Sequence, residues 1–101
     1  MGYTVLMRVQ MTEVYRDWID ALKDRAGRAR IQMRIDRLAH GNPGQHRNLS
    51  EAMSELKIDV GPGYRVYYTE RGGELIILLA GGAKSTQQQD IATARALARN
   101  L

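Results

Sequence analysis

The stretch that decides the fold is SELKIDVGPGYRVYY, residues 54–68. In its first half, the apolar residues Leu56, Ile58 and Val60 alternate with charged ones. This period of two predicts a strand of an antiparallel sheet with one face toward a core. The Gly-Pro-Gly turn that follows predicts a hairpin pairing this strand with a second strand, Tyr64 to Glu70.

The flanking sequence extends this sheet. A glycine-containing turn precedes Glu74 to Ala80, a third strand whose apolar residues on both faces predict a central position rather than an edge. The polar residues 45–50 are interpreted as a loop. A last helix is expected from about Thr86 to Arg99, with Ser85 as its N-cap and Gln88 completing a capping box.

The first half predicts one strand and two helices. Tyr3 to Val9 alternates like a strand. A helix with Thr12 as N-cap carries one apolar stripe, which is Val14, Trp18 and Leu22. Gly27 is expected to interrupt it. A second stripe, Ile31, Ile35 and Leu38, ends at Gly41-Asn42-Pro43-Gly44.

These elements predict an α+β fold. An N-terminal helical hairpin packs on one face of a small, mainly antiparallel sheet, a C-terminal helix follows, and the other face is partly open. The 101 residues are enough for one domain, residues 1–101. Tyr64 and Tyr68 are expected in the core.

Composition narrows the possible functions. The chain has no cysteine, so we expect no disulfide and no cysteine metal site. No signal-peptide pattern and no apolar run of about 18 residues is present, which predicts a cytoplasmic protein. The net charge of +4 favours a polyanion or an acidic protein as partner, although a merely solvated basic surface has the same charge.

Three cationic residues form a candidate phosphate site. Lys57 and Arg65 share one polar face of the hairpin with Tyr67, and Lys84 follows two glycines just before the last helix. An arginine fork can hold a phosphate with two hydrogen bonds, and a helix N-terminus attracts anions. The spacing before Lys84 does not match a Walker A loop, because Ala83 precedes it.

Each of these residues also has a structural interpretation. Lys57 could pair with an acid across the sheet such as Glu70, and Arg65 with Glu55 or Asp59. Lys84 could simply lie near the start of a helix.

The chain resembles a known family at several motifs. They are Glu55-Leu56-Lys57-Ile58, Gly61-Pro62-Gly63-Tyr64-Arg65-Val66-Tyr67-Tyr68, Leu78 to Gln87 and, in the first half, Trp18-Ile19, Leu22-Lys23-Asp24 and Gly41-Asn42-Pro43-Gly44. Through these residues the chain resembles the RelE/ParE superfamily of type II toxins, most of all the HigB-like addiction module killer proteins. The likeness covers about residues 12–99.

The resemblance implies a toxin that cleaves mRNA on the ribosome, as a metal-independent endoribonuclease that needs no cofactor. By position, Lys57, Arg65 and Lys84 correspond to catalytic basic residues; Tyr67, Ser85 and Gln87 are expected to bind substrate. Two departures are Ala83, where this branch commonly has an acid, and the absence of the C-terminal tyrosine that serves RelE.

In that reaction the RNA's own 2′-hydroxyl attacks the phosphorus. We expect Lys57 to take the proton, Arg65 to hold the phosphate oxygens, and Lys84 to neutralise charge or protonate the leaving oxygen. Tyr67 could orient a base.

The resemblance also implies the partners. They are a cognate antitoxin, expected to be a HigA-like helix-turn-helix protein, together with the ribosome and mRNA; promoter DNA would be contacted only through the antitoxin complex, and no membrane is involved. Two alternatives stay open. One is a ParE-like poison of DNA gyrase without nuclease activity, and the other is an inert domain that binds an acidic partner.

Overall fold

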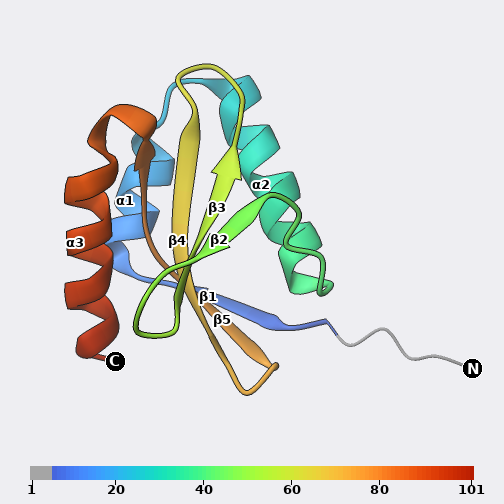
Figure 1. Cartoon of the computed structure of the whole chain (residues 1–101). Helices are drawn as coiled ribbons and strands as arrows, with labels where there is room; N and C mark the ends of the chain where they lie inside the picture. Colours follow the sequence, from blue (N-terminus) through green and yellow to red (C-terminus); the bar gives the residue numbers. More distant parts are fainter. Residues whose placement is uncertain (1–5) are drawn as a thin grey trace, which may run out of the picture.

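The structure, a computed structural model, describes residues 6–101. Its sheet consists of β1 (Arg8–Met11), β2 (His46–Asn48), β3 (Met53–Ile58), β4 (Tyr64–Arg71) and β5 (Leu75–Ala83). The helices are α1 (Glu13–Ala21), α2 (Arg25–Ala39) and α3 (Gln87–Arg99), with a 3₁₀ turn, η1 (Lys84–Thr86), before α3. The strand order is β1-β5-β4-β3-β2. Helices α1 and α2 cover one face of the sheet and α3 covers the other (Figure 1).

The expected fold class is wrong about the N-terminal end of the fold. A strand, β1, comes before the helices, and it pairs in parallel with β5, with Arg8 opposite Leu75. β5 is apolar on both faces, as expected of an interior strand, and β1 gives its outer edge a hydrogen-bonded neighbour. The fold is therefore a mixed α/β arrangement. Of the strand expected over Tyr3–Val9, residues 3–5 lie outside the described residues, and the observed strand is Arg8–Met11.

The central hairpin is confirmed. β3 pairs antiparallel with β4, with Lys57 opposite Arg65 and Glu55 opposite Tyr67. Strand β5 has neighbours on both edges, as its apolar sequence predicted. The interpretation of residues 45–50 as a loop missed β2, an edge strand of three exposed polar residues that contains no apolar alternation.

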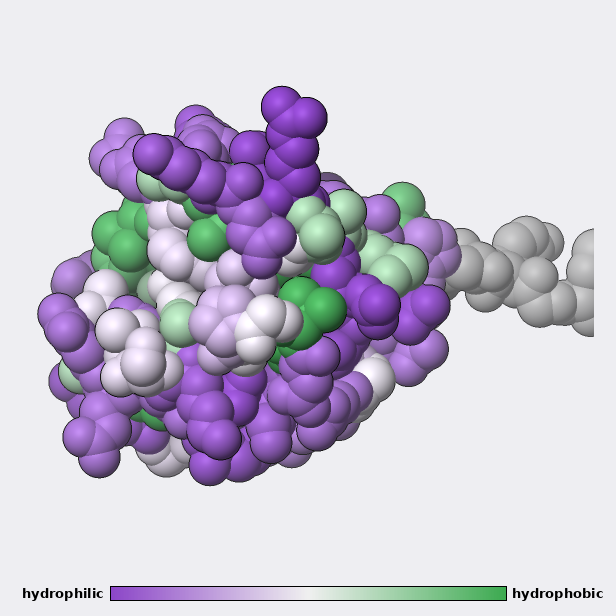
Figure 2. Space-filling model, turned by 90° about the horizontal axis from the view of Figure 1, so that it is seen from above, coloured by the Kyte–Doolittle hydropathy of each residue, from purple (hydrophilic) through white to green (hydrophobic). Residues whose placement is uncertain are grey.

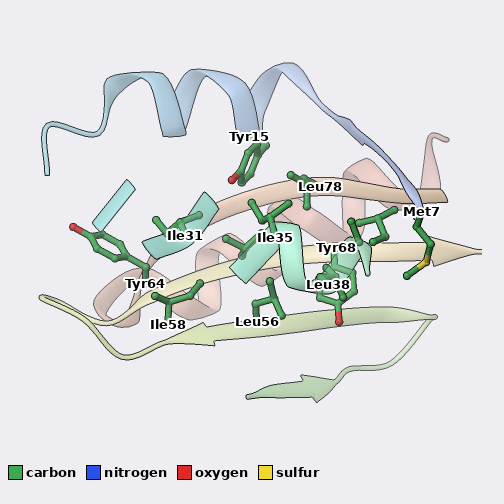
Figure 3. Close-up of a cluster of buried hydrophobic side chains, with 13 residues drawn as sticks. Met7, Tyr15, Ile31, Ile35, Leu38, Leu56, Ile58, Tyr64, Tyr68 and Leu78 are labelled. Carbon is green, nitrogen blue, oxygen red and sulfur yellow. The ribbon is translucent and has the colours of Figure 1, made fainter. Parts of the chain in front are cut away.

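The larger core lies between the sheet and the pair α1 and α2 (Figure 3). Tyr64 and Tyr68 are buried in it, as predicted. Tyr15 hangs from α1 toward β5 and is buried, whereas Val14, which the expected stripe placed inward, is 41% exposed. Trp18 is partly buried and packs against this core, and its ring lies over Gly81, where a Cβ would clash with it.

The opposite face of the sheet carries a second apolar cluster beneath α3. It consists of Met53, Tyr67, Ile77, Leu79, Ala80 and Ala94. This face was expected to be partly open, but α3 packs on it along β4 and β5. Polar side chains that share this face must therefore be paired or lie beyond the end of the helix.

The helix boundaries have local causes. The Thr12 hydroxyl accepts a hydrogen bond from the Tyr15 N–H, which confirms it as the N-cap of α1. The interruption between the two helices comes before Asp24 and not at Gly27. Asp24 is the N-cap of α2, and its side chain accepts a hydrogen bond from the Gly27 N–H. A Cβ on Gly27 would lie 2.6 Å from the Tyr64 ring. Glycine here lets α2 approach β4 closely.

The surface seen in Figure 2 is mostly hydrophilic, with hydrophobic residues in small separate areas. Among residues 6–101, the large apolar side chains that are exposed are Leu6, Met11, Val14, Met33 and Leu101. In residues 6–101, no helix has the length and apolar character needed to cross a membrane.

The contact between Asp24 and Tyr64 predicts a pH dependence of stability. The Tyr64 hydroxyl donates to Asp24 Oδ2 at 2.7 Å, and this bond, with the Gly27 N–H, lowers the pKa of Asp24 below its ordinary 3.8. A lowered carboxyl pKa contributes stability that is fully present above about pH 4 and is lost as the pH falls through the folded-state value. We expect Tyr64→Phe to destabilise the protein at pH 6 and the difference from wild type to shrink below pH 4, in urea melts.

Asp24→Asn provides the matched control, since its own unfolding free energy lacks this acid titration. A wild-type to Tyr64→Phe difference that stayed constant down to pH 2 would contradict the assignment.

Candidate phosphate-binding site

A pocket of about 240 Å³ opens where β2, β3 and β4 meet the start of α3. Its lining residues are Arg47, Glu55, Lys57, Arg65, Lys84 and Gln87. Four of them are cationic and one is anionic. The excess of positive charge suits a phosphate group.

Strand register brings these side chains together. Arg47 on β2 lies opposite Glu55 on β3, and Lys57 lies opposite Arg65 on β4. Lys84 arrives from the end of β5, where its N–H donates to the carbonyl of Gly63 at 2.7 Å. Pocket residues from four separate elements are thus placed by backbone hydrogen bonds.

The floor of the pocket is a buried ion pair. Glu55 is 1% exposed and Arg65 is 4% exposed. Arg65 Nε lies 3.7 Å from Glu55 Oε1, an ion-pair contact too long for a hydrogen bond, and its Nη1 donates to the Tyr64 carbonyl at 3.0 Å. The pairing with Glu55, kept as the structural alternative for Arg65, is therefore present.

Tyr67 is fully buried beneath α3. Burial, and secondarily the nearby Glu55 carboxylate, raises the pKa of its phenol. Because the ring has no exposed surface, it offers no face on which a base could stack. The strand parity correctly placed Tyr67 beside Arg65, but it could not reveal that a helix covers this face.

The accessible cations surround the rim of the pocket. The Arg47 side chain is 53% exposed, Lys84 is exposed and Lys57 is half-buried. The backbone at Lys57 is fixed from behind, because Arg34 of α2 donates to its carbonyl at 2.7 Å and also holds the carbonyl of Gln45 at 2.8 Å. These three rim cations can meet an incoming phosphate.

The start of α3 differs from the expected capping box. Ser85 is exposed within η1, and Thr86, not Ser85, precedes α3; the Thr86 hydroxyl bonds to Asp90 at 2.6 Å. Gln87 is the first residue of α3, and its side-chain amide donates to Glu55 at 2.9 Å. Ser85 lines a neighbouring polar pocket of about 450 Å³ that shares Lys84 and Gln87 with the first.

Two pocket residues, Glu55 and Arg47, were absent from the predicted site. Glu55 has the same parity as Lys57, so the alternation that selected Lys57 could have included it. Arg47 lies in the short strand β2, for which the sequence gives no apolar signal. Within residues 6–101, no three histidine, cysteine, aspartate or glutamate residues are grouped to hold a metal ion.

The fold and the pocket define a small mixed α/β protein with a cationic site beside the start of its last helix. The family model described as "Phage derived protein Gp49-like (DUF891)" matches residues 17–100, which include the whole pocket. The chain is also 42% identical over 95 residues to a Haemophilus influenzae protein described as "Uncharacterized protein", covering 94% of this chain and 96% of that protein. The chain belongs to the Gp49-like family, a toxin-like family of the RelE/HigB type.

The buried pair predicts that Arg65 is needed for stability. Removing one partner of a buried ion pair costs on the order of 3–5 kcal/mol, because the remaining charge stays desolvated. We expect Arg65→Ala to lower the melting temperature by at least about 10 °C in a domain of this size, whereas Lys84→Ala, at an exposed position, changes it little. Thermal unfolding followed by circular dichroism measures both.

Arg65 is therefore a buried partner of Glu55 and not the open phosphate fork that the sequence suggested. Equal melting temperatures for Arg65→Ala and wild type would show that the Glu55 charge does not depend on Arg65.

Proposed function

We propose that this protein is the toxin of a type II toxin–antitoxin pair and that it cleaves mRNA on the ribosome without a bound metal. The observation that carries the proposal is the pocket, where Arg47, Lys57 and Lys84 surround a buried Glu55–Arg65 pair. Its net positive charge and open rim fit a backbone phosphate. The HigB-like branch of the superfamily is part of the same proposal.

The proposed reaction uses the RNA as its own nucleophile. The 2′-oxygen forms a bond to phosphorus while the bond from phosphorus to the 5′-oxygen breaks, which leaves a 2′,3′-cyclic phosphate and a free 5′-hydroxyl. The protein then has to align these atoms, stabilise the extra negative charge and move two protons.

The rim cations have distinct parts in this reaction. Arg47 and Lys84 hold phosphate oxygens from opposite walls, because they come from β2 and from η1. Lys57, in its neutral amine form, takes the proton of the 2′-hydroxyl, and the ammonium of Lys84 gives one to the 5′-oxygen. Arg65 acts from the floor by adding positive charge beneath the phosphate. Each well-placed donor of this kind contributes on the order of 3 kcal/mol to a transition state.

The ribosome is expected to supply the remaining alignment. The residues that line the pocket include no aromatic ring, and the nearby Tyr67 is buried. Holding the RNA backbone in line therefore needs a surface outside the protein. The antitoxin is proposed to neutralise the toxin by covering the rim with acidic or apolar side chains.

Cleavage in a translation extract tests the function. Purified protein added to translating ribosomes is expected to produce mRNA fragments with cyclic phosphate ends, and Lys57→Ala and Lys84→Ala are each expected to reduce the rate by about 100-fold. Treatment of the purified protein with EDTA, followed by removal of the EDTA before ribosomes are added, should not alter the protein's activity. Lys23→Ala, at an exposed lysine outside the pocket, is the matched control and is expected to cleave normally.

Two results would contradict the proposal. One is growth inhibition with intact mRNA and gyrase-linked DNA breaks, which would assign the protein to the ParE-like class. The other is an equal loss of cleavage in Lys23→Ala and Lys84→Ala, which would reduce the pocket to general surface charge.

A further inference from the structure

The carboxylate of Glu55 joins three parts of the pocket. Its Oε2 accepts a hydrogen bond from Arg47 Nη2 at 3.1 Å and one from Gln87 Nε2 at 2.9 Å. Its Oε1 faces Arg65 Nε at 3.7 Å. These three side chains belong to β2, α3 and β4, so a single side chain on β3 contacts every other wall of the pocket except the one that carries Lys84.

The burial of Glu55 needs a reason beyond stability. A buried carboxylate is costly, and replacement of a buried ion pair by apolar residues of similar volume is often neutral or stabilising. Here the acid lies next to the apolar cluster under α3, beside Tyr67, where an apolar residue would also fit the face. What the carboxylate adds is orientation of the groups around it.

Orientation matters most for Arg47 and Gln87. The Arg47 side chain is half exposed on an edge strand of three residues, and the structure gives it no other side-chain hydrogen bond among residues 6–101. Gln87 begins α3, so its bond to Glu55 fixes the helix start next to Lys84. Without the carboxylate, both side chains would be free to rotate.

The same geometry argues against proton transfer by Glu55. It is 1% exposed, one oxygen already receives two donors, and the other faces Arg65 at the floor. In the proposed reaction the 2′-hydroxyl gives its proton to Lys57 at the rim, whereas both oxygens of the Glu55 carboxylate point at side chains of the pocket wall and floor.

We propose that Glu55 is the positioning residue of the pocket, holding Arg47 and the start of α3 in the arrangement that aligns the RNA phosphate. This inference rests on the proposed RNA cleavage. It assigns Glu55 no direct contact with the substrate, and it explains why Gln87, expected to bind substrate, points its amide at a buried carboxylate instead.

The test uses exchange of the two partners. Glu55→Gln places an amide against the Gln87 amide and Arg47, and Gln87→Glu places two carboxylates together. The double variant E55Q/Q87E restores an amide–carboxylate pair with the same total charge as the wild type. Glu51→Gln is the matched control, because Glu51 pairs with Arg99 on the surface, away from the pocket.

On ribosomes, we expect Glu55→Gln and Gln87→Glu each to lower kcat by about 100-fold, the typical cost of a misplaced reacting group. KM is expected to stay unchanged or fall in Glu55→Gln, because the pocket becomes more positive. The double variant should recover at least tenfold of the lost kcat, and Glu51→Gln should match wild type. Partial unfolding alone would not lower kcat while leaving KM unchanged, and it would not be reversed in the double variant.

A second readout does not depend on activity. In nuclear magnetic resonance spectra, the side-chain amide of Gln87 and the Nη2 protons of Arg47 should exchange slowly with water in the wild type and faster in Glu55→Gln. If Glu55→Gln misfolds, the Gln87→Glu and double variants carry the test. If wild type cleaves no RNA, the proposed function fails, and the exchange rates alone decide whether Glu55 orders these side chains.

Three outcomes would overturn the inference. They are wild-type kcat in a folded Glu55→Gln protein, unchanged exchange at Gln87 and Arg47, and a Glu55→Gln pH–rate profile that has lost its acidic limb, which would make Glu55 a general base.

Discussion

The rest of the structure depends on the burial of both faces of β4. Its residues from Tyr64 to Thr69 are all buried, one set facing α1 and α2 and the other facing α3. A strand covered on both sides can carry a charge only where a partner is supplied within the fold. Arg65 is that charge, and Glu55 from β3 is the partner. The pocket lies at the start of α3, where the helix no longer covers the sheet and this pair begins.

This arrangement separates charges that support the site from charges that can meet a ligand. Arg65 and Glu55 lie on the floor and are closed to solvent, while Arg47, Lys57 and Lys84 remain accessible. The net positive charge of the pocket is therefore carried at its rim. The buried pair has no net charge, and the rim charges provide contacts that can form and break with a substrate.

The sequence predicted the parts of the fold that have a strong period. The β3–β4 hairpin, the interior position of β5 and the Thr12 cap follow from alternation and from capping chemistry in neighbouring residues. The place of β1 beside β5 could not be read in this way, because parallel pairing joins segments far apart in the chain. Gly27 was misjudged for the same reason, since the contact that requires glycine is made with Tyr64.

The sequence predicted three cations of the candidate site but not the elements that surround them. Lys57, Arg65 and Lys84 do line one pocket. Strand parity also placed Tyr67 on their face, but parity carries no information about what covers that face. The short β2 strand, which brings Arg47, has too few residues for any periodic pattern. Prediction of a site from alternation is therefore reliable for side-chain direction and unreliable for exposure.

The chain order of the sheet has a consequence for synthesis. β1 is made early, but its partner β5 comes much later; the Thr12 hydroxyl, just after β1, bonds to the carbonyl of Leu79, 67 residues along the chain. Lys84 and Gln87 follow β5 directly. A nascent chain thus has neither a closed sheet edge nor a complete pocket until residue 87 has left the ribosome. The ribosome has therefore translated most of the message before the cationic pocket can form.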